Sequence, residues 1–478
     1  MYTLMVVIFV LGYIGIALEH NIKVDKAASA LITGALAWTF LVFGAESIFD
    51  IDYSWSVSEF ISNAGGLGAE LKHYLESLTM THAHGESVSE ITNSFIISEL
   101  KHHLVEISEI LFFLIGAMTI VEVIDTHDGF KIITDKIKTT KKIKLLWVLS
   151  IITFFMSATL DNLTASIVMA TLLKKLIADK KDLWLFAGII IIAANAGGAW
   201  SPIGDVTTIM LWIGGQVTAL NIIKVLILPS MVTILVPLIL LSFTLKGKIA
   251  RPDSYGDKDK QLTTNKEKNS IFALGVLALV QVPIFKTVTN MPPFMGVLLG
   301  LGVLWLYTEL LHRKKPTNIK SKLSVVYTLR RIDTPSVLFF LGILMAVAAL
   351  QTAGHLIQVA HLLENKIGNM YIINLTIGLL SAIVDNVPLV AAAMGMYEVG
   401  PEGAGLLAYP TDHPFWEFLA YCAGTGGSVL IIGSAAGVAI MGILRIDFVW
   451  YIKKISLYAL AGYFAGAGAF YVLINMVM

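Results

Sequence analysis

Long apolar stretches, separated by short polar ones, follow one another along the whole chain. Each is long enough to cross the roughly 30 Å hydrocarbon core of a membrane as a helix. Helices satisfy their backbone hydrogen bonds internally, so the pattern predicts an all-α polytopic membrane protein. The expected spanning helices lie near residues 3–18, 27–45, 107–125, 183–213, 222–245, 270–285, 293–311, 335–352, 414–444 and 450–476. The first has no basic run before it and no small-residue cleavage pattern after it, which favours a retained helix over a signal peptide.

Two further apolar stretches differ from the others because Asp-Asn interrupts each near its middle. They cover residues 143–178 and 370–398. A full crossing by either would scatter the basic loops over both sides of the membrane. We therefore predict that both are re-entrant hairpins, which enter and leave the membrane on the same side.

Composition and charge support a membrane protein and orient it. Of all residues 56% are apolar and 14% are charged, and the mean hydropathy is +0.77. With the predicted spans, 29 of the 34 Lys and Arg residues fall in loops on one side. Cytoplasmic loops carry the excess of positive charge, so both termini are expected outside the inner (plasma) membrane. The single cysteine, Cys422, excludes an intrachain disulfide and a thiolate metal site.

The longest predicted external stretch, residues 46–106, is acidic and contains five histidines. A solvated or amphipathic surface segment is one interpretation. A pH sensor is the other, because histidine titrates near neutral pH.

Three motifs recur in the same order at offsets of 224 to 229 residues. The pairs are L-F-F-L at 111–114 and 338–341, S-A-T-L-D-N at 157–162 with S-A-I-V-D-N at 381–386, and N-A-G-G-A-W-S-P-I-G-D at 195–205 with G-T-G-G-S-V-L-I-I-G-S at 424–434. Each half contains five spanning helices and one hairpin. Since five is odd, the second half must be inverted, which is typical of secondary transporters with broken helices at the midplane.

This repeat defines the expected domains. The first repeat is 1–246, with scaffold helices in 1–125 and the hairpin and transport helices in 143–246; a cytoplasmic linker covers 247–269; the second repeat is 270–478, with scaffold helices in 270–352 and the hairpin and transport helices in 370–478.

Polar residues at the predicted helix breaks supply only oxygen ligands from carboxylates, amides and hydroxyls. The hairpin tips carry Ser157, Asp161, Asn162, Thr164, Ser381, Asp385 and Asn386, and the broken helices carry Asn195, Asp205, Thr207, Thr208, Thr425, Ser428 and Ser434. Such ligands suit a hard cation, and Na⁺ is expected at Asp161, Asn162, Asn195 and Asp205. The alternatives are helix N-capping by Asp and Asn and close helix packing by Ser and Thr. Glu109 is a candidate of second rank.

No P-loop, dinucleotide fingerprint or nucleophile-base arrangement occurs in the sequence, so neither an enzyme nor an ATP-driven pump is expected. No cofactor and no nucleic-acid partner are expected.

The motifs resemble those of the ion transporter superfamily, which includes sodium-coupled divalent-anion symporters, citrate carriers, arsenite exporters and NhaD-type sodium/proton antiporters. The similarity covers essentially the whole chain and is greatest to NhaD, on the segments 103–114, 157–165, 195–208 and 381–388. The resemblance implies a homodimer in which each hairpin domain moves against a scaffold. It also implies functional roles for Asp161, Asn195, Asp205, Thr207, Thr208, Ser381, Asn386, Ser428 and Ser434.

The carboxylates favour a cation as substrate, because Asp161, Asp205 and Asp385 would repel an anion. Protons and Na⁺ would compete for these groups, which predicts exchange of cytoplasmic Na⁺, and also of Li⁺, for external H⁺ by alternating access, with a role in pH homeostasis. Asp205 corresponds to Ser434 and Asn195 to Gly424, so the first half is expected to dominate ion binding. The alternatives are a Na⁺-coupled carboxylate or anion symporter and, from another class, a channel or receptor.

Overall fold

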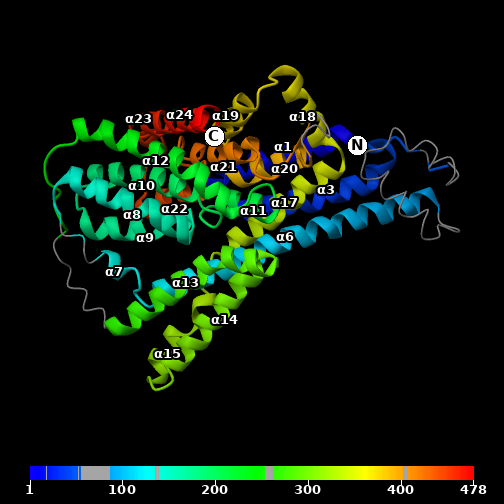
Figure 1. Ribbon diagram of the computed structural model, residues 1–478. Coiled ribbons are helices and arrows are strands. Elements are labelled where there is room, and N and C mark those ends of the chain that lie inside the picture. Colours follow the sequence, from blue (N-terminus) through cyan, green and yellow to red (C-terminus); the bar gives the residue numbers. More distant parts are fainter. Residues whose placement is uncertain are drawn as a thin grey trace. The chain divides into compact units, whose positions relative to one another are not determined.

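The described part of the chain is mainly helical in the computed structural model (Figure 1). The structure describes residues 1–17, 19–51, 53–54, 87–134, 137, 139–252, 262–401 and 407–477. One two-stranded sheet, β1 (Glu398–Val399) with β2 (Ala408–Tyr409), occurs in this part. Three of the five histidines considered as a pH sensor, His73, His82 and His84, lie outside the described residues.

Two compact units make up the chain, and each draws on both halves of the sequence. The first unit comprises Met1–Leu111, Asp333–Gly368 and Ala391–Glu398, and the second comprises Phe112–Ile332, Asn369–Val390 and Val399–Met478. Two helices, α6 (Val88–Thr126) and α20 (Asn386–Met396), contribute to both units. The other helices of the first unit are α1 (Tyr2–Ala17), α2 (Glu19–Ile22), α3 (Lys26–Ile48), α17 (Thr334–Thr352) and α18 (His355–Lys366).

The second unit holds the remaining helices. They are α7 (Lys131–Thr134), α8 (Lys142–Leu160), α9 (Asn162–Leu176), α10 (Lys180–Ala199), α11 (Val206–Ile213), α12 (Ala219–Thr244), α13 (Asn265–Thr289), α14 (Pro293–Leu311), α15 (Thr317–Leu323), α16 (Val325–Leu329), α19 (Met370–Leu380), α21 (Pro414–Gly426), α22 (Ala435–Leu444), α23 (Phe448–Lys454), α24 (Ser456–Val472) and the π-helical turn η2 (Leu473–Val477).

The helix content confirms the predicted all-α membrane fold. Within the described residues, nine helices are long and apolar enough to span a membrane, and the pair α22–α23, bent by 116°, would make a tenth. Both long predicted spans that contain glycine-rich motifs, 183–213 and 414–444, are broken into two helices, as expected. One difference concerns α8, which at 19 residues is itself long enough to cross, although it was predicted as one arm of a re-entrant hairpin.

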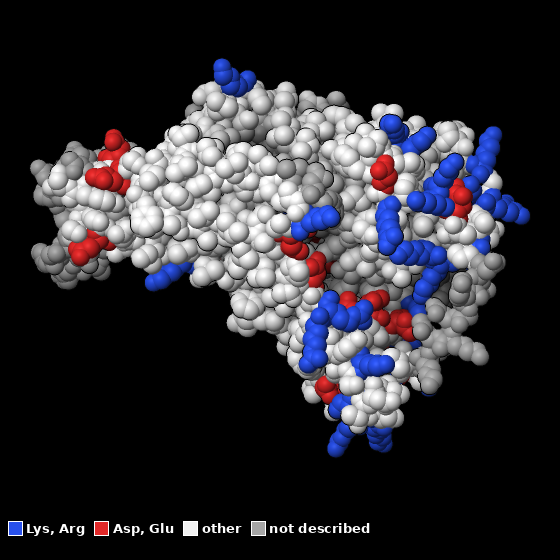
Figure 2. All heavy atoms as spheres, turned by 180° about the vertical axis from the view of Figure 1, so that it is seen from behind, with Lys and Arg blue, Asp and Glu red and all other residues white. Residues whose placement is uncertain are grey.

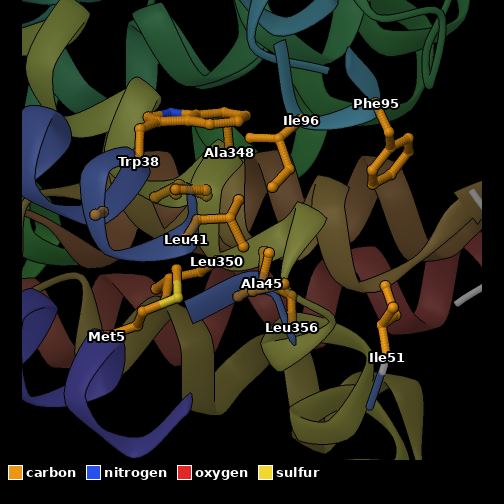
Figure 3. Packing of buried hydrophobic residues seen from close by; sticks show 14 of the residues in the cluster. Met5, Trp38, Leu41, Ala45, Ile51, Phe95, Ile96, Ala348, Leu350 and Leu356 are labelled. Carbon is orange, nitrogen blue, oxygen red and sulfur yellow. The ribbon is translucent and has the colours of Figure 1, made fainter. Parts of the chain in front are cut away.

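A buried apolar cluster forms the core of the first unit (Figure 3). Helices α3 and α17 pack side by side there, with Trp38, Leu41 and Ala348 pointing into the cluster. The two backbones approach closely at a glycine, since a Cβ on Gly34 would lie 2.6 Å from the Gly342 carbonyl oxygen. Small residues permit such close helix crossings in membrane proteins.

Figure 2 shows most of the visible Lys and Arg side chains gathered towards one end of that face, whereas much of the rest carries no charged side chain. The orientation of the chain in the membrane stays a prediction from the positive-inside pattern of the sequence.

Candidate ion-binding site

The tip of the first hairpin is a single residue, Asp161, between α8 and α9. Its backbone has φ 77° and ψ 158°, a region that is essentially restricted to glycine and costs about 1–3 kcal/mol for other residues. Both carboxylate oxygens accept hydrogen bonds from Thr164, Oδ1 from the backbone N–H and Oδ2 from the hydroxyl, each at 2.8 Å. Asp161 therefore caps α9, as the N-cap alternative proposed, and does so in a strained conformation.

Asp205 stands at the break between α10 and α11. It is 1% exposed and caps α11, where its Oδ1 accepts from the Thr207 backbone N–H at 3.0 Å and from the Thr207 hydroxyl at 2.9 Å. Its Oδ2 accepts from the Asn162 amide at 2.6 Å. All three donors are neutral. Among the described residues no Lys, Arg or His forms an ion pair with Asp205.

The buried amide of Asn195 links the two halves of the chain. Its Oδ1 accepts from Asn162 Nδ2 at 3.1 Å, and its Nδ2 donates to Ser428 Oγ at 2.9 Å and to Ser434 Oγ at 2.8 Å. Together with Asp205, these residues form one hydrogen-bonded network, which we call the Asn195 network. It consists of the predicted site residues Asn162, Asn195, Asp205, Ser428 and Ser434, and the hydroxyl of a further one, Thr207, bonds to its Asp205.

The second hairpin lies between α19 and α20 and carries Ser381, Asp385 and Asn386. It belongs to the second unit, which also contains Asn195 and Asp205. Asp385 Oδ1 accepts from the backbone N–H of Val387 at 3.2 Å, another N-capping contact. The Asn386 side chain is buried near Asp205, and its Nδ2 makes no hydrogen bond within the described part of the chain.

Equivalent residues of the two motif pairs make equivalent contacts. Ser157 donates to the Ala194 carbonyl at 2.6 Å, and Ser381 donates to the Ala423 carbonyl at 3.1 Å. Asp205 and Ser434 each cap the helix that follows a break. Each hairpin therefore contacts the broken helix of its own sequence half, and the inverted orientation of the two halves stays a prediction.

Glycine residues allow each hairpin to approach its broken helix closely. A Cβ on Gly197 would lie closer than 3.0 Å to the Phe154 carbonyl of α8, and one on Gly426 would lie as close to the Gly378 carbonyl of α19. The hairpin and the broken helix therefore touch through their backbones in each half.

Some predicted residues lie outside the Asn195 network. Thr425 donates to the Tyr421 carbonyl of its own helix at 2.6 Å, and Thr208 makes only a 3.5 Å contact with the Gly198 carbonyl. Glu109 belongs to the first unit, whereas the network lies in the second.

One buried carboxyl was missed by the sequence analysis. Glu417, in the first turn of α21, is 1% exposed and accepts a hydrogen bond from Asn221 Nδ2. Its position inside the apolar stretch 414–444 was a usable signal, because ionisable residues within membrane segments are usually functional.

The site is chemically suited to a hard cation. The Asn195 network contains oxygen atoms of a carboxylate, of amides and of hydroxyls. A carboxylate buried among neutral donors lacks compensation for its charge, so it favours either a proton or a cation.

Comparison with known proteins agrees with this chemistry. A family described as Citrate transporter matches residues 6–411. Sodium/proton antiporter 1 of Arabidopsis thaliana is 44% identical over 99% of this chain and 72% of its own length, and sodium/proton antiporter 2 of the same plant is 46% identical over 79% and 88%. The Na⁺/H⁺ antiporter NhaD of Alkalimonas amylolytica is 31% identical over 72% and 73%. The chain therefore belongs to the citrate transporter family and, within it, to the NhaD-type sodium/proton antiporters.

Proposed function

We propose that this protein is a secondary active transporter that exchanges cytoplasmic Na⁺, and also Li⁺, for external H⁺. The observation that carries the proposal is the Asp205 carboxylate, which is 1% exposed and accepts hydrogen bonds from the neutral groups of Thr207 and Asn162. The names of the relatives support the same pair of ions.

Competition between the two ions follows from the charge of this site. An ionised Asp205 without a protein cation is costly at this depth, and either Na⁺ or H⁺ relieves that cost. Because binding of one ion removes the site for the other, the two cannot bind Asp205 together. Asp161 and Asp385, at the hairpin tips, add further carboxylates to the ion path.

Alternating access requires the loaded site to face each side of the membrane in turn. The equivalent contacts of Ser157 and Ser381 support an inverted repeat, in which two hairpins and two broken helices surround one site. In this proposal the sequence halves are inverted, both termini are external to the inner (plasma) membrane and the protein works as a homodimer.

A Na⁺-coupled symporter of carboxylates is the second candidate, favoured by the description of the matching family as Citrate transporter. The carboxylate of Asp205 opposes it, because an anionic substrate would be repelled at the centre of the Asn195 network. Uptake of a labelled tricarboxylate or dicarboxylate by proteoliposomes, driven by a Na⁺ gradient, would support the symporter and contradict the antiporter.

The proposal is tested by Asp205→Asn in everted membrane vesicles, with a dye that reports Na⁺-induced recovery of internal pH. We expect the exchange to be lost while the protein is still produced and folded, since an amide can accept the capping hydrogen bond but carries no charge. Asp333→Asn is the matched control. Asp333 also caps a helix, α17, by accepting hydrogen bonds from the backbone N–H and the hydroxyl of Ser336, but it is exposed. Unchanged exchange in Asp205→Asn would contradict the proposal.

A further inference from the structure

A buried tyrosine outside the predicted site reaches into it. Tyr451 lies on α23, which follows α22 after a bend of 116°. Its side chain is 0% exposed, and its hydroxyl donates a 2.8 Å hydrogen bond to the backbone carbonyl of Ser428. Ser428 lies just after the end of α21, where the broken helix no longer supplies partners for its own carbonyls.

Ser428 is therefore held at two atoms by residues far apart in the sequence. Its carbonyl accepts from Tyr451, and its Oγ accepts from Asn195 Nδ2 at 2.9 Å. A free carbonyl at a break in the membrane is costly and is also available to bind an ion. The tyrosine hydroxyl satisfies this carbonyl and restricts where the serine hydroxyl can lie.

The corresponding position in the first half has no tyrosine hydroxyl. With the offset of 229 residues that relates the two broken-helix motifs, Tyr451 corresponds to Ile222 on α12. Ile222 is also 0% exposed but has no hydroxyl. Both breaks contain close-packed glycines and are followed by a capped helix, but the hydroxyl contact made by Tyr451 has no counterpart at Ile222.

We propose that Tyr451 is a positioning residue for ion exchange, which acts by holding Ser428 in the orientation that receives the Asn195 amide. Through Asn195 and Asn162, this orientation is transmitted to Asp205, which is the group that meets the ion. The inference rests on the proposed function, because it assigns the Asn195 network to ion binding.

The test is a double-mutant cycle on the apparent KM for Na⁺ in proteoliposomes. Tyr451→Phe removes one hydroxyl and should raise this KM roughly three- to tenfold, the size expected for one hydrogen bond, with little change in maximal rate. Ser428→Ala keeps the carbonyl but removes the hydroxyl through which Tyr451 acts. In the Ser428→Ala background, Tyr451→Phe should therefore leave the KM unchanged.

Tyr463→Phe is the matched control. Tyr463 is equally buried, and its hydroxyl also donates to a backbone carbonyl, that of Leu375 at 3.0 Å, which is not part of the Asn195 network. It should lower thermal stability about as much as Tyr451→Phe while leaving the KM for Na⁺ unchanged. If Tyr451→Phe does not fold, Tyr451→His is used in the same cycle with the same criterion.

Two outcomes would overturn the inference: an unchanged KM in Tyr451→Phe, or an equal rise of the KM in the parent and in Ser428→Ala. A failure of the proposed function is recognised separately, because it would leave exchange intact in Asp205→Asn. Loss of exchange in Asp205→Asn with an unchanged KM in Tyr451→Phe would contradict only the role of Tyr451.

Discussion

Asn195 donates a 2.8 Å hydrogen bond to Ser434, the residue that takes the place of Asp205 in the second half of the chain. The same amide reaches Asp205 itself through Asn162. One side chain thus connects the two equivalent helix caps, one with a carboxylate and one with a hydroxyl. That the carboxylate-bearing first half dominates ion binding stays a prediction.

Removal of this amide should damage exchange more than stability. Asn195→Ala leaves the Ser428 and Ser434 hydroxyls and the Asn162 amide without their shared partner, so we expect the apparent KM for Na⁺ to rise at least about tenfold. Asn374→Ala is the control. Asn374 is also fully buried, and its amide donates to the Phe415 carbonyl, which is not part of the Asn195 network. Both variants should unfold at lower temperature, but an increased KM in Asn374→Ala would show that the effect is not specific to the network.

The strained hairpin tip predicts an unusual order of stabilities. Asp161→Gly loses the cap of α9 but relieves a backbone conformation that glycine tolerates, whereas Asp161→Ala loses the cap and keeps the strain. The glycine variant should be more stable, by about 1 kcal/mol or more, in thermal unfolding in detergent. Neither should exchange Na⁺ for H⁺. Equal stability of the two variants would contradict the strained conformation of Asp161.

Backbone contact between the hairpin and the broken helix predicts that Gly197 and Gly426 cannot be enlarged. Their Cβ atoms would collide with carbonyl oxygens, so Gly197→Ala and Gly426→Ala should each destabilise the protein by roughly 1–3 kcal/mol or prevent its folding. Gly302→Ala, where a Cβ meets no atom within 4 Å, is the control and should be neutral or stabilising. Thermal unfolding of the purified variants gives the comparison, and a well-folded Gly197→Ala would contradict the close contact.

A buried pair of histidines outside the spanning helices predicts how stability depends on pH. His127 and His312 are stacked, with their Nε2 atoms 2.9 Å apart, and His127 Nδ1 donates to the Val123 carbonyl. Burial, followed by the nearby His127 and Lys315, lowers the pKa of His312 to about 4, and burial also lowers the pKa of His127. The pair should therefore remain neutral near pH 7.

The direction of this pH dependence follows from the number of protons that each state binds. Between pH 4 and 6.5 the unfolded chain binds more protons at position 312 than the native protein does, so the free energy of unfolding falls as the pH is lowered. Above about pH 6.5 His312 is neutral in both states and does not change the free energy of unfolding. Towards pH 4 its protonation in the unfolded chain lowers this free energy by up to about 3 kcal/mol. In His312→Gln the melting temperature should fall less steeply over this range. An unchanged slope would contradict a native His312 that resists protonation.

Much of the site was predictable because its chemistry is visible in the sequence. Asp-Asn inside apolar stretches and paired glycine motifs indicated the helix breaks, and Asn162, Asn195, Asp205, Ser428 and Ser434 do meet. The sequence could not tell which hydroxyls turn towards the site. Thr425, for example, bonds to its own helix, a choice that depends on side-chain rotation within a helix.

Tyr451 was not predictable from pattern. It follows Trp450 in a short aromatic segment that resembles an interfacial anchor, and its contact with Ser428, 23 residues earlier, is made after the bend between α22 and α23. The start of α6 at Val88 was also missed, because the polar residues before 107 do not have the composition of a spanning segment although they continue the same helix. In both cases tertiary packing, which local composition does not encode, decides the outcome.

Competition of Na⁺ and H⁺ for one carboxylate is best tested by measuring Na⁺ binding to the purified protein by calorimetry at several pH values and in buffers of different ionisation enthalpy. The account predicts that Na⁺ binding releases protons. At pH values low enough to protonate the site, the affinity for Na⁺ should fall by up to about tenfold for each pH unit. Asp205→Asn should abolish both effects. Na⁺ binding that is independent of pH and releases no proton would contradict it.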